Sequence, residues 1–182
     1  MSENKDTIKK VKIVLLGEEG VGKTNILSQF IEHIFLDNSQ STLSASYRSK
    51  NLILDNETQI KIELWDTSGK EKYRALSKLY FKDSNAIILV YDKTRKKSFD
   101  ELKNYWAKFV KESHVKKDDV IFALVENKSD LEKTEVDEET ALKFAEELNA
   151  IFSRISAKNG IGIDDLFSQI AKKANEQNNY FY

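Results

Sequence analysis

A glycine-rich segment, residues 17–24, has the residue types and spacing that suit the binding of phosphate groups. It reads GEEGVGKT and matches the pattern G-x-x-x-x-G-K-[ST] at every fixed position. Glycines let backbone N–H groups turn inward and surround phosphate oxygens. Lys23 supplies a cation for the outer phosphates, and the hydroxyl of Thr24 suits a ligand of Mg²⁺. The segment therefore predicts a site for a nucleotide polyphosphate with Mg²⁺.

The residues on either side of this segment predict a strand before it and a helix after it. Residues 10–16 form a short apolar run, and the apolar residues between 26 and 31 recur at helical spacing. The N-terminus of a helix attracts anions, so this order places the segment where a phosphate would bind. The residues predicted to contact the phosphates are Glu19, Gly20, Val21, Gly22, Lys23, Thr24 and Asn25.

Three further polar motifs each follow a predicted strand. In residues 66–69 (DTSG), Asp66 can hold the Mg²⁺ shell and Gly69 can present its N–H to a terminal phosphate. In residues 127–130 (NKSD), the carboxylate of Asp130 can accept two hydrogen bonds from the edge of guanine, which adenine cannot supply. Residues 156–158 (SAK) can donate a backbone N–H to the guanine oxygen. The residues predicted to bind the base are Asn127, Lys128, Asp130, Ser156, Ala157 and Lys158.

The order of the remaining elements predicts the fold that positions these motifs. Two alternating segments, 52–54 and 60–64, indicate a hairpin. Further strands are predicted at 86–91, 120–125 and 150–155, and helices at 98–110, 137–149 and 163–175. Strands that alternate with helices predict an α/β fold, a six-stranded and mostly parallel sheet with helices on both faces. Ligands of such sheets bind beyond the carboxyl ends of the strands, where all four motifs fall.

Composition restricts the classes of function. The chain has 182 residues, which predicts one domain. We expect this domain to cover 8–175, the extent of the family resemblance described below, between a flexible N-terminus (1–7) and a C-terminal extension (176–182). The chain has 29 Lys and Arg residues and 30 Asp and Glu residues. It therefore lacks the excess of basic residues that would indicate nucleic acid as a partner. There is no cysteine, no apolar run of membrane-spanning length and no apolar core of a signal peptide. We therefore expect a cytoplasmic location.

The segments GEEGVGKT, WDTSGKE, NKSD and SAK together resemble those of the Ras-superfamily small GTPases. Within that superfamily, residues 61–92 are most similar to the Rab branch, and to its endosomal members in particular. The resemblance covers about residues 8 to 175. It implies the P-loop small-GTPase fold and a switch that binds GTP or GDP with Mg²⁺ and regulates vesicle traffic at endosomal or other membranes.

The resemblance also implies roles for particular residues. Thr42 matches the threonine that ligates Mg²⁺ only in the triphosphate state, beside Thr24 and Asp66. Phe35 matches the aromatic that packs on guanine, although an ordinary core residue at a helix end would also fit. Two loops, 36–45 and 69–82, would respond to the third phosphate and contact exchange factors, activating proteins and effectors. The aromatic residues matching those that Rab proteins show to effectors, which core packing would also explain, are Tyr47, Trp65 and Tyr80.

Three single positions depart from the family, and so does the run at 43–46 (LSAS), which replaces a more usual glycine-containing run. Lys70 replaces the usual Gln that orients the attacking water; with Lys23 and Gly69 it makes up the predicted catalytic set. A lysine cannot accept a hydrogen bond from water, so we expect slow hydrolysis of GTP. Glu19 stands where a small residue is usual; it would repel the third phosphate, obstruct an arginine finger or pair with Lys70. Glu126 stands where Gly usually precedes the NKSD motif, and we expect local adjustment only.

Alternatives remain open at this stage. The chain is either a GTPase switch or a module that holds GTP constitutively and recruits effectors; a nucleotide kinase shares the glycine-rich motif but not the guanine motifs. Rab proteins usually end in a tail whose cysteines are prenylated, and residues 178–182 (NNYFY) contain none. Either the sequence stops before such a tail or the protein does not anchor in this way. We expect membrane attachment only through a lipidated tail.

Overall fold

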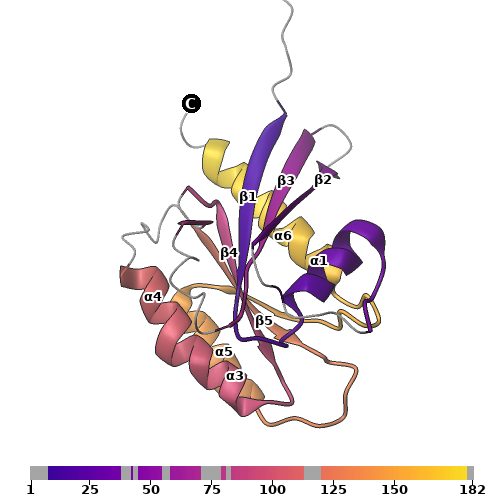
Figure 1. Cartoon of the computed structure of the whole chain (residues 1–182). Coiled ribbons are helices and arrows are strands. Elements are labelled where there is room, and N and C mark those ends of the chain that lie inside the picture. The colour runs from indigo at the N-terminus through magenta and orange to yellow at the C-terminus, as the bar shows by residue number, and fades with distance from the viewer. Residues whose placement is uncertain are drawn as a thin grey trace, which may run out of the picture.

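The computed structural model describes residues 8–37, 42, 45–54, 58–70, 79–80, 83–112 and 120–179, without the side chains of 111–112 and 178–179. Its strands are β1 (Lys9–Leu16), β2 (Ser46–Leu54), β3 (Thr58–Asp66), β4 (Ala86–Asp92), β5 (Ile121–Asn127) and β6 (Ile151–Arg154). Its helices are α1 (Lys23–Glu32), α3 (Lys96–Glu101), α4 (Ala107–Glu112), α5 (Glu138–Leu148) and α6 (Ile163–Asn179), and a π-helical turn, Leu102–Trp106, joins α3 to α4 (Figure 1).

These strands form one six-stranded sheet in the order β2-β3-β1-β4-β5-β6. Only the β2–β3 pair is antiparallel; β1 pairs in parallel with both β3 and β4, and β5 with both β4 and β6. Every residue of β4 and β5 is buried, as continuous apolar runs in a sheet covered on both faces require. The predicted six-stranded, mostly parallel sheet with helices on both faces is therefore confirmed.

Helices α1 and α6 cover one face of the sheet, as Figure 1 shows. Their apolar sides meet where the rings of Phe30 and Phe167 stack with centroids 3.8 Å apart, both almost fully buried. Ile26 and Leu27 of α1 and Ile170 of α6 pack in the same cluster. This packing fixes α1, whose first turn follows the glycine-rich segment. Helix α6 ends at Asn179, beyond the Asn175 that the hydrophobic pattern predicts as its end.

The opposite face is covered by α5 and by the long helical segment that contains α3 and α4. The sequence predicts one helix over 98–110; the observed segment is longer and contains the π-helical turn, which adds a residue to one helical turn. Helix α5 has the expected limits: the side chain of Asp137 accepts a hydrogen bond from Thr140 N at 3.0 Å, and Asn149 closes the helix in the left-handed conformation. Within the part of the chain that the structure describes, no helix has the length and apolar character needed to cross a membrane.

Candidate nucleotide-binding site

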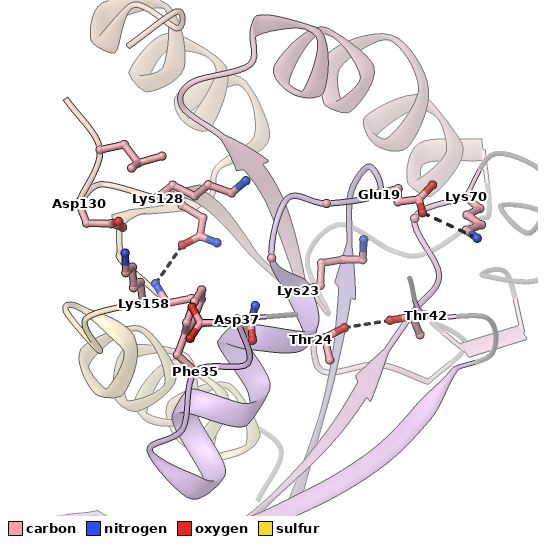
Figure 2. Close-up of a pocket in the computed structure, with 17 residues that line it drawn as sticks. Glu19, Lys23, Thr24, Phe35, Asp37, Thr42, Lys70, Lys128, Asp130 and Lys158 are labelled. Atoms are coloured by element: carbon pink, nitrogen blue, oxygen red, sulfur yellow. Dashed lines mark hydrogen bonds and ion pairs between the residues drawn. The ribbon is translucent and has the colours of Figure 1, made fainter. Parts of the chain in front are cut away.

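A cavity of about 440 Å³ opens at the carboxyl ends of the strands, within the usual size range of small-molecule sites. Figure 2 shows Lys23 and Thr24 toward one end of it and Asp130, Lys128 and Lys158 toward the other. The structure therefore gathers residues from four separate sequence motifs around one space. The lining residues that the sequence predicts are Glu19, Gly20, Gly22, Lys23, Thr24, Asn25, Phe35, Thr42, Gly69, Lys70, Asn127, Lys128, Asp130, Ala157 and Lys158.

The glycine-rich loop wraps the phosphate end of the cavity. Gly22 has a φ of 99°, and a Cβ at this position would lie 2.4 Å from Nδ2 of Asn127, so no side chain fits there. Lys23 opens α1, and its Nζ donates to the carbonyl oxygens of Gly17 at 2.8 Å and Glu18 at 2.9 Å. An ammonium group has three donors, so one remains for an anion in the cavity. Burial lowers the pKa of Lys23 to about 8, and a bound phosphate would favour the charged form.

Three side chains form an oxygen cluster suited to Mg²⁺ beside the phosphate loop. Thr24 Oγ1 donates to Asp66 Oδ2 at 2.6 Å, and Thr24 Oγ1 and Thr42 Oγ1 lie 2.9 Å apart. The other carboxylate oxygen of Asp66, Oδ1, is buried and has no hydrogen-bond partner among the described residues. Burial raises the pKa of Asp66, despite the hydrogen bond from Thr24 and the charge of Lys23. An orphaned carboxylate oxygen beside two hydroxyls is a donor set that fits Mg²⁺.

The base end of the cavity is built from the loops after β5 and β6. Nδ2 of Asn127 donates to the carbonyl of Val21 at 2.8 Å, and its Oδ1 accepts from the backbone N–H of Ala157 at 3.1 Å. Oγ of Ser156 donates to Oδ1 of Asp130 at 2.6 Å, which orients the carboxylate predicted to read guanine. Asn127 therefore joins the phosphate loop to both base-reading loops.

Phe35 is placed at the cavity by the first residues after α1. The side chain of Asn25 bonds both backbone groups of Leu36, accepting from its N–H at 3.0 Å and donating to its carbonyl at 3.3 Å. These two bonds fix the turn that carries Phe35 to the cavity wall. The position favours a stacking role over the alternative of an ordinary core residue, because Phe35 lines the cavity.

A buried aspartate pairs with Lys128, which is one of the residues predicted to bind the base. Nζ of Lys128 lies 2.7 Å from Oδ2 of Asp92, whose side chain is only 2% exposed. Oδ1 of Asp92 accepts from the N–H and the hydroxyl of Thr94. Burial acts to raise the pKa of Asp92, but the hydrogen bonds from Lys128 and Thr94 outweigh it and hold the pKa below its usual value. The carboxylate thereby orients the stem of Lys128 along the cavity.

Comparison with known proteins identifies the family. A sequence model of the Ras family matches residues 12–176, nearly the whole chain. The chain belongs to the Ras family. It is 38% identical over 167 residues to Ras-related protein Rab-22A of Homo sapiens, covering 91% of this chain and 84% of the relative. It is 35% identical over 164 residues to GTP-binding protein ypt5 of Schizosaccharomyces pombe, covering 89% and 76%. With Ras-related protein Rab-21 of Geodia cydonium it shares 38% identity over 178 residues, covering 97% and 76%. The predicted Rab branch is confirmed.

The two unusual residues of this Rab-type GTPase lie next to each other. Nζ of Lys70 and Oε1 of Glu19 are 3.8 Å apart, an ion pair that Figure 2 draws at the phosphate end of the cavity. The pairing was one of the outcomes expected for Glu19. The backbone of Gly69, the residue before Lys70, lies against Glu19, because a Cβ on Gly69 would be 2.3 Å from the backbone nitrogen of Glu19. Only glycine at position 69 allows the second loop to start against the phosphate loop.

The three aromatic residues expected at the effector surface are neighbours on the Rab-type domain. The rings of Tyr47 and Trp65 meet edge-on with centroids 5.5 Å apart, and Trp65 and Tyr80 are also 5.5 Å apart. Tyr47 is 47% exposed, whereas Trp65 and Tyr80 are partly buried. The cluster is therefore a surface feature with a packed base. Much of the two switch loops lies outside the described residues, at 38–41, 43–44, 71–78 and 81–82.

Asp66, predicted as a metal ligand, is buried and does not line the cavity, and four other residues also differ from the predicted lining. The side chain of Val21 is in the apolar core and Ser156 is fully buried, so both act behind the wall rather than on its surface. Asp37 and Leu131 line the cavity but are not among the predicted residues. Each lies one or two positions from a predicted residue, Phe35 or Asp130, and adjacency to these was the only signal in the sequence.

Proposed function

We propose that this chain is a guanine-nucleotide switch with Mg²⁺ that regulates vesicle traffic at endosomal membranes. The observation that carries the proposal is one cavity with a base-reading carboxylate, Asp130, at one end and a buried ammonium, Lys23, at the other. A guanosine di- or triphosphate has donors on its base edge and anionic oxygens on its tail. The traffic role and the endosomal location rest on the Rab-type relatives and the sequence resemblance.

Each end of the cavity has its own part in binding. Asp130 accepts hydrogen bonds from the guanine edge, a backbone N–H of residues 156–158 donates to the guanine oxygen, and Phe35 covers the ring. Lys23 and the backbone N–H groups of the glycine-rich loop hold the phosphates. Thr24, Thr42 and Asp66 hold Mg²⁺, which when bound neutralises phosphate charge.

The output of the switch is a change of surface. Thr42 approaches Thr24 and Asp66 at the metal site, and Gly69 starts the second loop against the phosphate loop. Both loops lead to the aromatic cluster of Tyr47, Trp65 and Tyr80, which we propose as the effector contact. Exchange factors and activating proteins would act on the same loops.

Hydrolysis by this chain is slow in our proposal. The side chain of Lys70 lines the cavity but has no acceptor for a proton of the attacking water. Its ammonium group is directed to Glu19, 3.8 Å away, so a lysine takes the place of the water-orienting amide. The chain then remains loaded with GTP for longer than a relative with glutamine at this position.

The Glu19–Lys70 ion pair also supports a second candidate function. A pair that joins the phosphate loop to the second loop contributes to the same closed arrangement that the third phosphate favours. In that case the chain is a module that holds GTP constitutively and recruits effectors. Nucleotide extracted from purified protein separates the two: GDP supports a turning-over switch, and GTP supports the constitutive module.

Calorimetry with an altered base reader tests the binding itself. The unmodified chain should bind GDP and reject ADP. Asp130→Asn should lose GDP affinity by about tenfold or more and gain affinity for xanthosine diphosphate, because Asn can donate to the oxygen that xanthine has in place of the guanine amine. No heat with GDP or GTP, or equal affinity for ADP, would reject the proposed function.

A further inference from the structure

The last paired residues of β5 and β6 are oppositely charged. Glu126 and Arg154 are register partners at the final rung of the β5–β6 ladder. Directly after this rung, the chain enters the two loops that carry Asn127 to Asp130 and Ser156 to Lys158. Any interaction between the side chains of this rung therefore acts at the point where the two base-reading loops diverge.

The Glu126 carboxylate is buried and fully engaged by protein groups. Its Oε1 accepts from Nε of Arg154 at 2.7 Å, and its Oε2 accepts from the hydroxyl of Tyr91 at 2.8 Å. The side chain of Glu126 is 4% exposed, that of Arg154 is 44% exposed, and Nη2 of Arg154 extends to Glu138 at 3.1 Å. Burial, followed by the charge and hydrogen bond of Glu126, raises the pKa of Tyr91, so its hydroxyl remains a donor.

This cluster lies on the side of the sheet that faces away from the cavity. Side chains alternate along a strand, and Phe122 and Leu124 pack in the cluster under α5, on the same side as Glu126 and Tyr91. Asn127 points the other way and lines the cavity. Glu126 and Arg154 do not line it, so they can affect the nucleotide only by positioning the residues that do.

Those residues depend on the two loops staying together. Ile155 N donates to Glu126 O at 2.8 Å, and Ser129 N donates to Ile155 O at 3.0 Å. Beyond them, Ala157 N bonds to Asn127 and the Ser156 hydroxyl bonds to Asp130. Strand β6 has four residues, lies at the edge of the sheet and, within the described part of the chain, pairs with β5 alone. A short edge strand is weakly held, so side-chain contacts at its last rung matter.

We propose that Glu126 and Arg154, with the Tyr91 hydroxyl, are positioning residues that hold the NKSD and SAK loops in the spacing that guanine requires, and so slow nucleotide release. This inference rests on the proposed function, because it concerns the same cavity. It also gives a role to the glutamate that replaces the glycine usual at this position. A buried carboxylate is stable only with its partners, so Arg154 is required once Glu126 is present.

The test uses a set of variants in the full chain. Glu126→Gln keeps the shape and removes the charge, Arg154→Met removes the partner, and the double variant leaves no buried charge unpaired. Tyr91→Phe removes only the hydroxyl. Glu138→Gln is the matched control, because it removes the exposed contact of Arg154 and leaves the Glu126 contact intact.

Release of GDP and of inosine diphosphate is measured for each variant by stopped-flow fluorescence with labelled nucleotides. Inosine diphosphate lacks the amine that Asp130 reads, so it depends less on the position of that carboxylate. We expect Glu126→Gln and Arg154→Met to speed GDP release by about tenfold, the loss of one charge-assisted hydrogen bond, and inosine diphosphate release by less. The double variant should release GDP no faster than either single variant, because all three variants lose the same interaction. Glu138→Gln should leave both rates unchanged.

The melting temperature of each variant separates positioning from general stability. If the Glu126–Arg154 pair were only structural, its loss would lower the melting temperature but would leave the ratio of the inosine diphosphate release rate to the GDP release rate unchanged. The inference would be overturned if folded variants at 126 and 154 kept the parent's ratio of GDP to inosine diphosphate release rates. It would also be overturned if Glu138→Gln changed GDP release as much as those variants do. If the variants at 126 and 154 do not fold, GDP release by Tyr91→Phe tests the inference instead. We expect faster release than from the parent, and an unchanged rate would overturn the inference. Absence of GDP binding by the unmodified chain would instead reject the proposed function, and the inference with it.

Discussion

Arg95 donates a hydrogen bond from Nη2 to the backbone carbonyl of Glu19, 2.9 Å away, and its Nε lies 3.4 Å from the Asp92 carboxylate. The loop after β4 is thereby bonded to the phosphate loop. Asp92 in turn holds Lys128, so Arg95 and Lys128 share one carboxylate between the phosphate end and the base end of the cavity. Arg95 and Asp92, which connect the two ends of the site, lie outside the four motifs.

Replacing Arg95 should loosen the phosphate loop. A charge-assisted hydrogen bond at a half-exposed position contributes about 1 kcal/mol, so Arg95→Ala should speed GDP release by about fivefold. Lys97→Ala, which removes an exposed cation two residues further on, is the control and should have no effect. Equal release rates for Arg95→Ala and the unmodified protein would show that the bond does not restrain the loop.

Asp92 should make the stability of the nucleotide-free protein depend on pH at the acid end. Its pKa in the folded protein lies below the ordinary 3.8, so protons bind more readily to the unfolded chain. The contribution of Asp92 is therefore complete above pH 3.8 and is lost as the pH falls through the folded pKa. Denaturant unfolding should show Asp92→Asn less stable than the parent at neutral pH, with a difference that shrinks on acidification. A difference that stays constant with pH would contradict this assignment.

Restoring a hydrogen-bond acceptor at position 70 should restore hydrolysis. We expect single-turnover hydrolysis of GTP by Lys70→Gln to be faster than that of the parent by about tenfold or more, because the amide orients the attacking water. Lys70→Met is the control; it breaks the ion pair with Glu19 without supplying an acceptor, and its rate should stay close to that of the parent. An unchanged or slower rate in Lys70→Gln would refute the proposed cause of slow hydrolysis.

Glu19 should obstruct an activating protein. We expect an activating domain of Rab-type GTPases to leave the parent rate within about twofold, and to accelerate the double variant Glu19→Ala, Lys70→Gln by about tenfold or more. Lys70→Gln alone, measured in parallel, separates the contribution of Glu19 from that of Lys70. Full stimulation of the unmodified chain would exclude this role of Glu19.

The stacked pair between α1 and α6 should carry a large share of the stability. Phe167→Ala removes a fully buried ring that contacts Phe30 at 3.8 Å between centroids, and should lower the free energy of unfolding by about 3–5 kcal/mol. Leu142→Ala on α5, where the side chain is 40% exposed, should change it by less than about 0.5 kcal/mol. A small effect of Phe167→Ala on chemical unfolding would mean that the α1–α6 contact forms independently of this ring.

The sequence predicted the fold and most of the cavity because local signals decide both. Strand periodicity and polar motifs at strand ends are properties of short segments, and parallel strands bring their carboxyl ends to one edge. Thr24, Asp66 and Asp130 could therefore be assigned before their contacts were known. Lys70 and Glu19 could be singled out because they break a pattern, but their pairing was only one of three possibilities that the sequence left open for Glu19.

Features that depend on register or on three-dimensional packing were not predicted. The Glu126–Arg154 contact requires the register of β5 against β6, and the spacing of 28 residues along the chain carries no signal for it. The sequence does not reveal the π-helical turn at Leu102–Trp106, because the apolar residues at 99, 102, 106 and 109 also fit the period of an ordinary α-helix. Arg95 lies among the charged residues at 93–97 (KTRKK), and their sequence alone does not indicate a contact with the phosphate loop.

Gly69 and Glu19 are in such close contact that not even a methyl group could be inserted between them. The start of the second loop and the tip of the phosphate loop therefore share a steric boundary, and neither can shift toward the other. A rearrangement on one side must be accommodated on the other by backbone movement, because no side chain lies between them to absorb it. A side chain at position 69 would therefore force these two segments apart.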